Sequence, residues 1–129
     1  MPAKRQVIEV EGLGHGDNPI PVAVKAGGWL FTGTVPGIDR ATGTFPDQVA
    51  TEIANAFDNL GAVLEAAGVA WGDVTKVDVS LRDKAHRNFV NDNWLKYFPD
   101  DDDRPVRHVS RVDLPGEMNI QLQIVAMAS

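Results

Sequence analysis

The sequence contains no cysteine. Disulfide bonds, thiolate nucleophiles and cysteine-ligated metals are therefore excluded, and with no recognisable signal peptide the sequence predicts a cytoplasmic protein. It also has no apolar run close to the roughly 20 residues that a membrane-spanning helix needs. We therefore expect no membrane partner.

Positive charge is scarce as well. Twelve Lys and Arg residues stand against eighteen Asp and Glu residues, which gives a formal net charge of −6 and a pI near 4.9. Because this balance repels a phosphate backbone, we expect no nucleic-acid partner. For the same reason ribonuclease activity ranks below the two hypotheses given at the end of this section.

No metal site is predicted. The run Asp100–Asp103 is expected to form an exposed loop, since adjacent carboxylates repel one another, and it lacks the spacing, central glycine and distal glutamate of a calcium-binding hand. His15 and His86 are expected to be solvated. No acidic residue lies at ligand spacing from any of the three histidines.

What remains is a composition typical of one compact domain. The chain has 129 residues, a mass of 14.0 kDa and 43% apolar residues, enough to bury a core. We expect a single domain over residues 1–129.

The first third of the chain predicts three short strands and a loop. The strands are Val7–Val10, Val22–Ala26 and Trp29–Thr34. Residues 12–21 are rich in glycine and proline and favour a loop of the kind that often covers a pocket. Gly33 fits either a β-bulge or a close approach of the backbone to a ligand, and the sequence slightly favours the bulge.

The clearest element is an amphipathic helix over Pro46–Ala67, with Gly68 as its stop. Its apolar stripe at spacings of three and four comprises Val49, Ile53, Phe57, Leu60 and Leu64. Its polar positions, which we expect to form a solvated face, include Glu52, Asn55, Asp58 and Glu65.

A second helix is predicted from an Asp83 cap to about Phe98. It carries an aromatic face that we assign to the core. The members of that face are Phe89, Val90, Trp94, Tyr97 and Phe98.

Alternating patterns predict three more strands. Val74–Arg82 alternates cleanly, and Arg104–Ala126 contains two strands joined by Leu114, Pro115 and Gly116, which suggests a hairpin. The order of strands and helices fits two βαβ-like halves with both helices on one side of a single sheet, an α+β fold.

Several segments form a recognisable pattern when taken in order. They are AVKAGGWLFTGTVP, AFDNLGAVLEAAGVAWGDVTKVDVSLRD, FVNDNWLKYFP, RPVR, LPG and IQLQIVA. With these segments the chain, from about Pro19 to Ala126, resembles the Rid/YjgF family of reactive-intermediate deaminases. The resemblance implies a chorismate-mutase-like α+β fold with a mixed sheet, assembled as a barrel-like homotrimer with three clefts between subunits.

The resemblance also implies an activity. By this resemblance the protein would hydrolyse an enamine or imine of a small carboxylic acid and release ammonia and a 2-oxo acid, without a cofactor. The implied partner is therefore a small carboxylate-bearing substrate.

Arg107 is the first candidate for a substrate contact, because its planar guanidinium grips a carboxylate with two parallel hydrogen bonds. The resemblance assigns it this role, and the alternative is a salt bridge at a subunit interface. By the same resemblance the backbone at Gly33 and Val109, helped by the Thr32 hydroxyl, fixes substrate and attacking water. Asn91 matches an asparagine of the second helix in the family.

Three positions depart from the family pattern. Gln121 replaces a glutamate that handles water, and an amide positions water but cannot take its proton. Ile20 replaces a tyrosine of the loop that closes over substrate. His108 replaces a serine, and because strand side chains alternate we expect it on the opposite face from Arg107, at an interface or on the surface.

Two hypotheses follow. The first is a Rid-like hydrolytic deaminase in which Arg107 binds the carboxylate and Gln121 positions the water. The second is a non-catalytic trimer that binds or senses a small acid, in which loss of the glutamate and the tyrosine has left binding without turnover.

Overall fold

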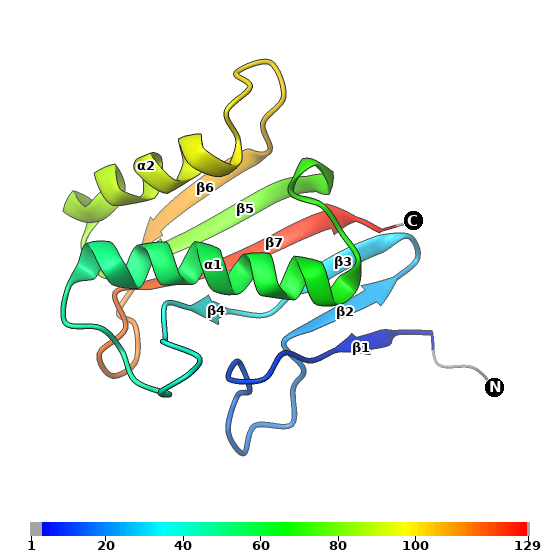
Figure 1. Cartoon of the computed structure of the whole chain (residues 1–129), viewed down its shortest axis with the longest axis horizontal. Helices are drawn as coiled ribbons and strands as arrows, with labels where there is room; N and C mark the ends of the chain where they lie inside the picture. The colour runs from blue at the N-terminus through cyan, green and yellow to red at the C-terminus, as the bar shows by residue number, and fades with distance from the viewer. Residues whose placement is uncertain (1–3, 129) are drawn as a thin grey trace.

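The computed structural model describes residues 4–128 as a seven-stranded mixed sheet and two helices (Figure 1). The strand order is β1-β2-β3-β7-β5-β6, and β4 also pairs with β7. The strands are β1 (Gln6–Ile8), β2 (Ala23–Ala26), β3 (Trp29–Thr32), β4 (Val35–Pro36), β5 (Val74–Leu81), β6 (Val106–Arg111) and β7 (Ile120–Met127). The helices are α1 (Val49–Ala67) and α2 (Arg87–Tyr97).

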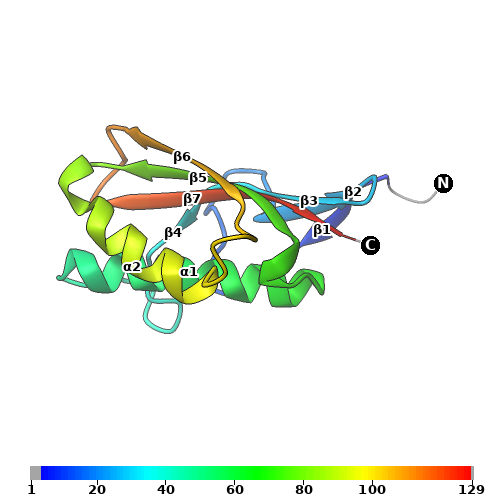
Figure 2. The same ribbon diagram turned by 90° about the horizontal axis from the view of Figure 1, so that it is seen from above.

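Both helices cover the same face of the sheet, which we call the helix face (Figure 2). The other side, the open face, carries no helix among residues 4–128. The predicted α+β class, with a mixed sheet and two helices on one side, is confirmed. The pairing of β5 with β6 is parallel, and the other strand pairs are antiparallel.

The core lies between the helices and the helix face of the sheet. Every second residue of β7, and of β5 from Val77 to Leu81, points into it, as the alternation predicts, whereas an irregularity between Val74 and Lys76 interrupts the pattern at the start of β5. The fully buried large side chains of α1 include Ile53, Phe57, Leu60 and Leu64, which confirms the predicted stripe.

Helix α1 begins at Val49 and not at Pro46. Gln48 is still extended, with φ −94° and ψ 129°, so Pro46 lies before the helix. Gly68 ends the helix in the left-handed region at φ 71°, a conformation that glycine adopts at little cost, as predicted.

One polar residue of α1 is not solvated. Glu52 is only 1% exposed, and its carboxylate accepts hydrogen bonds from Asn119 N at 2.7 Å and Asn119 Nδ2 at 2.8 Å. The prediction of a solvated Glu52 was wrong because the first turn of α1 packs against Asn119, the residue that precedes β7. Asp58 and Glu65 are exposed, as expected.

The predicted hairpin over Arg104–Ala126 is also wrong. Strands β6 and β7 both pair with β5, which lies between them. Arg82, directly after β5, holds the connection between them in place. Its guanidinium donates to Met118 O at 2.9 Å, Leu114 O at 2.7 Å and Gly116 O at 2.8 Å.

Helix α2 starts at Arg87, later than predicted, because Asp83 caps a separate 3-10 turn over Lys84–His86. The Asp83 carboxylate accepts from Ala85 N at 2.9 Å. Of the predicted aromatic face, Trp94 and Phe98 are buried, but Phe89 is 36% exposed and does not belong to the core.

Strands β1 and β3 are shorter than predicted. Four residue steps from Phe31 to Val35 face three steps from Val125 to Leu122 on β7, so one extra residue interrupts the pairing. This agrees with the bulge interpretation of Gly33. Within residues 4–128, no helix has the length and apolar character required to span a membrane.

We predict that Glu52→Ala lowers the free energy of unfolding by roughly 2 to 4 kcal/mol, because the partly buried N–H groups of Asn119 lose a charged acceptor and the fully buried Glu52 site is left empty. Urea unfolding followed by circular dichroism measures this. Glu65→Ala, on the exposed side of the same helix, should change it by less than about 0.5 kcal/mol. Equal effects of the two substitutions would contradict the structural role of Glu52.

Candidate functional site

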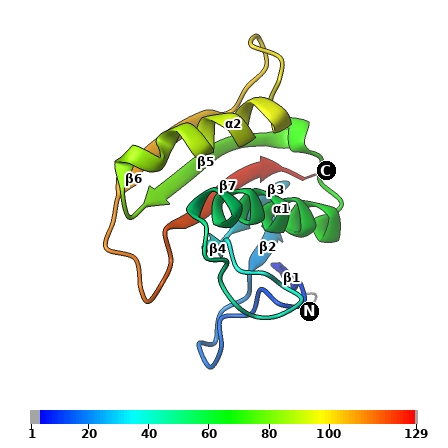
Figure 3. The same ribbon diagram turned by 60° about the vertical axis from the view of Figure 1, so that its left-hand side comes forward.

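Arg107 lies on the edge strand β6, with its side chain on the helix face. It stands opposite Val77 of β5, which is fully buried beneath the helices. Helix α2 runs along β5 and β6 (Figures 1 and 3) and presents Trp94 to the arginine. The Arg107 guanidinium carbon is 4.9 Å from the centroid of the Trp94 ring.

This environment disfavours the charged form of the Arg107 guanidinium. Burial lowers the pKa of the Arg107 guanidinium from its ordinary value, and the positive charge of Arg87 on α2 lowers it further. The two ion pairs found within residues 4–128 join Arg40 to Asp58 and Lys76 to Asp78. Arg107 therefore has a stacking partner but no carboxylate partner in the described chain.

Asn91 shares this part of α2. It lies three residues before Trp94 and four after Arg87, spacings that place all three on one side of a helix. Asn91 is half-buried. Val109, two residues after Arg107 on β6, points the same way and packs against the core.

His108 points to the open face, as predicted. It stands opposite Asp78 in the β5–β6 register and is exposed. Gln121 is on the open face as well, opposite Ser80, and its Nε2 lies 3.2 Å from Met118 Sδ. Arg107 and Gln121 therefore project from opposite faces of one sheet.

The remaining predicted residues lie on or next to β3, on the part of the sheet toward β1 and away from β6. Thr32 ends β3, and its Oγ1 accepts a hydrogen bond from Ile124 N at 2.9 Å. Gly33 N donates to Val22 O at 2.8 Å, and Ile20 is 54% exposed in the preceding loop.

These residues do not converge within one chain. Strands β7 and β5 separate β3 from β6. Three inter-strand spacings amount to roughly 14 Å, too far for one small acid to contact both Arg107 and Thr32. The chain thus presents two partial sites, one around Arg107 and one at Thr32 and Gly33, while Gln121 lies further along β7, opposite Pro36 and Ser80.

The open face between these two regions is apolar and uncovered. The exposed fractions are 42% for Trp29, 43% for Phe31, 67% for Val106 and 47% for Met127. Trp29, Phe31 and Val106 also line a shallow hollow of about 440 Å³, together with Val125, Thr75 and Lys76. A group of exposed large apolar side chains of this kind is typical of a protein interface.

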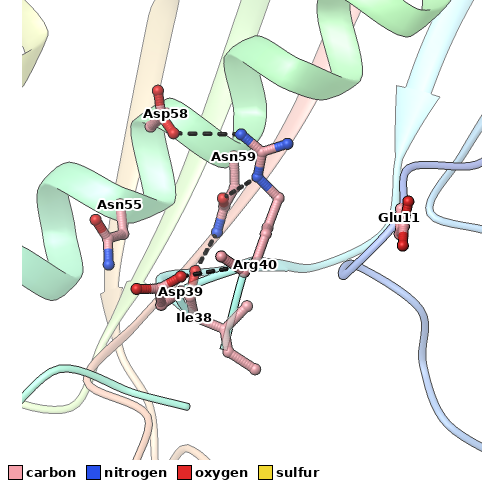
Figure 4. A pocket seen from close by; sticks show the side chains of 8 residues that line it. Glu11, Ile38, Asp39, Arg40, Asn55, Asp58 and Asn59 are labelled. Atoms are coloured by element: carbon pink, nitrogen blue, oxygen red, sulfur yellow. Dashed lines mark hydrogen bonds and ion pairs between the residues drawn. The ribbon is translucent and has the colours of Figure 1, made fainter. Parts of the chain in front are cut away.

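A separate polar groove of about 540 Å³ lies beside α1 (Figure 4). Its side chains bond to one another. Arg40 Nε donates to Asn59 Oδ1 at 2.9 Å, and Asn59 Nδ2 donates to the carbonyls of Pro36 and Ile38 at 2.8 and 2.9 Å. These contacts tie the loop after β4 to α1, which gives the groove a structural explanation.

The acidic loop is exposed, as predicted. The carboxylates of Asp100, Asp101 and Asp102 lie within 4.8 Å of one another. Asp100 Oδ1 accepts a hydrogen bond from Asp102 N at 3.0 Å, so part of this cluster forms a local turn.

Sequence reasoning missed two features of the structure. Trp94 was assigned to the core alone, although a βαβ crossover implies that α2 lies over β5 and β6. The solvated state predicted for His15 and His86 was wrong for one nitrogen of each, since His15 Nε2 and His86 Nδ1 are buried without a hydrogen-bond partner in the described chain.

Comparison with known proteins assigns the chain to a family. The family model described as Endoribonuclease L-PSP matches residues 18–128. A RutC family protein of Pyrococcus horikoshii is 32% identical over 125 residues, which are 95% of this chain and 97% of the relative. The chain belongs to the Rid/YjgF family.

Two further Rid/YjgF proteins bear on fold and function. The 2-iminobutanoate/2-iminopropanoate deaminase of Escherichia coli strain K12 is 28% identical over 125 residues, covering 95% of this chain and 97% of the deaminase. The crystal structure of the Escherichia coli YjgF gene product superposes with a TM-score of 0.84 at 26% identity, covering 96% of this chain and 99% of that one. The predicted Rid/YjgF membership and fold are confirmed.

We predict an energetic coupling between Arg107 and Trp94 of roughly 0.5 to 2 kcal/mol, because a partly desolvated guanidinium stacks on the ring. A double-mutant cycle with Arg107→Ala and Trp94→Leu, measured by urea unfolding, reports it. The control cycle replaces Arg107→Ala with Arg111→Ala, at an exposed position of β6. Additive effects in both cycles would contradict the stacking interaction.

Proposed function

We propose that this protein is a hydrolytic deaminase that acts on the imine or enamine of a small carboxylic acid, at clefts between the copies of a homotrimer. The observation that carries the proposal is Arg107, a half-buried guanidinium with an aromatic platform and no carboxylate partner in residues 4–128. A substrate carboxylate would supply the missing negative charge. The name of the Escherichia coli relative supports the reaction class.

The need for more than one copy follows from the division of the site. Arg107, Val109 and Asn91 lie at one edge of the sheet, whereas Thr32 and Gly33 lie three strands away. Packing the apolar open face of one copy against the β6 edge of the next would bring the two halves together. It would also cover Trp29, Phe31, Val106 and Met127.

The chemistry requires mainly orientation. An enamine first tautomerises to an imine, whose protonated form is electrophilic at carbon. The Arg107 guanidinium would hold the carboxylate with two parallel hydrogen bonds. A water held by the Gln121 amide and the backbone near Gly33 then attacks that carbon, and ammonia leaves to give the 2-oxo acid.

A binding protein of the same architecture is the second candidate, and Gln121 is the observation that favours it. An amide cannot take a proton from water. We do not propose the ribonuclease activity named in the family model, because a net charge of −6 disfavours a phosphate backbone.

We predict that Arg107→Ala lowers kcat/KM for ammonia release from freshly generated 2-imino acids by roughly 30- to 1000-fold, the effect of losing a partly desolvated arginine–carboxylate pair. Arg107→Lys should recover only part of the loss, since an ammonium lacks the planar fork.

Arg111→Ala is the matched control and should behave like the wild type. If the wild type releases no ammonia from a broad panel of imines, but Gln121→Glu with Ile20→Tyr does, the binding protein is the better description. Equal activity of wild type and Arg107→Ala would refute the assigned role.

We predict that Phe31→Arg converts the trimer to monomers and abolishes deamination, because it places a charge on the apolar open face. Light scattering coupled to gel filtration measures the mass, starting from the 14.0 kDa chain. The control is Leu95→Arg, which charges an equally exposed apolar position on α2, outside the open face. A wild-type monomer with full activity would contradict the shared site.

A further inference from the structure

A second cation lies on the side of α2 that carries the Arg107 site. Arg87 begins this helix, four residues before Asn91 and seven before Trp94, and these spacings place the three side chains on one side of the helix. Trp94 is the residue whose ring stacks on the Arg107 guanidinium. Because α2 lies alongside β6, the strand of Arg107 (Figure 3), both arginines border the same surface between this helix and this strand.

Both guanidinium groups are without a carboxylate partner. Neither takes part in an ion pair within residues 4–128. Asp83 is the acidic residue nearest to Arg87 in sequence, but its Oδ1 accepts a hydrogen bond from Ala85 N at 2.9 Å and it forms no ion pair with Arg87. A chain with a net charge of −6 therefore keeps two uncompensated positive charges at one site.

The two cations also act on each other. Burial lowers the pKa of the Arg107 guanidinium, and the charge of Arg87 lowers it further, because each positive charge disfavours the other. Between Arg87 and Trp94, this side of α2 carries Val90 and Asn91, neither of which is charged. The residues of the helix that lie between the two cations thus do nothing to relieve their repulsion.

A ligand with a single carboxylate would compensate only one of these charges. If that carboxylate binds Arg107, which is half-buried and stacked on Trp94, Arg87 is still unpaired. A second carboxylate on the same ligand would remove the remaining repulsion and would accept charge-assisted hydrogen bonds from Arg87. Arg87 is exposed, so we expect this second contact to be weaker than the first and to act mainly on the choice between substrates.

We propose that the substrate is the imine of a dicarboxylic acid, with the carboxylate next to the imine carbon on Arg107 and the distal carboxylate on Arg87. This inference rests on the proposed deaminase function and names its substrate class. The hydrolysis itself is unchanged. The water oxygen becomes the carbonyl oxygen, the C–N bond breaks, and both water protons leave on ammonia, so the product is a 2-oxo dicarboxylic acid and no oxidant or reductant is consumed.

The test compares substrates that differ by one carboxylate. 2-Iminosuccinate carries a carboxylate in place of the terminal methyl group of 2-iminobutanoate, and 2-iminoglutarate is related to 2-iminopentanoate in the same way. Each imine is generated in the assay by an amino-acid oxidase, and ammonia release is measured. We expect the wild-type kcat/KM to be roughly 5- to 20-fold higher for the dicarboxylic imine in at least one pair, the effect of one charge-assisted contact at an exposed site.

Substitutions of Arg87 should change the ratio of the dicarboxylic to the monocarboxylic kcat/KM. Arg87→Gln should abolish the preference, and Arg87→Glu should reverse it, because a carboxylate there repels the distal carboxylate. Lys96→Gln is the matched control. It also removes one positive charge from an exposed position of α2, but Lys96 lies nine residues after Arg87 and so on the opposite side of the helix, and the wild-type ratio should persist. The ratio does not depend on the fraction of active protein, so a partly unfolded variant still reports.

The outcomes separate this inference from the deaminase proposal. If the wild type hydrolyses the monocarboxylic imines in an Arg107-dependent manner but prefers neither dicarboxylic imine, the role of Arg87 is refuted and the deaminase stands. An equal loss of preference in Lys96→Gln and Arg87→Gln would also refute it, since net charge and not position would then be responsible.

Calorimetric titration covers the case in which no imine is hydrolysed. The probes are 2-oxoglutarate and 2-oxopentanoate, which differ by the same distal carboxylate and need no turnover. Tighter binding of 2-oxoglutarate that is lost in Arg87→Gln would support the dicarboxylate site in a protein that is not a deaminase. Equal binding of the two probes by the wild type would overturn the inference.

Discussion

The alternation of side chains across the sheet is the constraint on which the candidate site depends. Successive residues of a strand point to opposite faces, so the register of β5 with β6 and β7 decides what each face displays. Arg107 stands opposite buried Val77 and faces the helices, whereas Gln121 stands opposite Ser80 and faces away from them. One copy of this chain holds the two residues on different sides of a single layer.

That arrangement also explains the composition of the two faces. The helix face is covered by α1 and α2 and carries the core, while the open face carries Trp29, Phe31, Val106 and Met127 without cover. Their position between β3 and β6 is the basis for the interface proposed above.

Local sequence patterns predicted the helices and strands well, but they predicted the pairing of the strands less well. The period of α1 and the alternation of β5 and β7 are local signals, and each was confirmed. Pairing is a long-range property, and β6 and β7 looked like a hairpin because they are consecutive strands joined by a short link, residues 112–119, that contains Pro115 and Gly116. The crossover through α2 instead places β6 on one edge of β5 and leaves the other edge for β7.

The candidate residues show the same division. The family resemblance identified Arg107, Gln121 and Gly33, and alternation correctly placed His108 on the other face from Arg107. Neither the resemblance nor the alternation could reveal that Arg107 stacks on Trp94 or that Glu52 is buried against Asn119, because both contacts join different elements of the chain. The buried nitrogen of His15 was hidden for the same reason, since its neighbour Gly33 belongs to another element.

The contacts of Arg82 and Glu52 have a consequence for how this chain can evolve. Arg82 fixes three carbonyls of the link between β6 and β7, and Glu52 fixes Asn119, the residue directly before β7. A one-residue change in the length of that link, passed on to β7, would exchange the faces of Gln121 and Leu122. An amide would enter the core and a leucine would leave it. Because these contacts extend from Leu114 to Asn119, they oppose a change of length in this part of the link and keep Gln121 on the open face and Leu122 in the core.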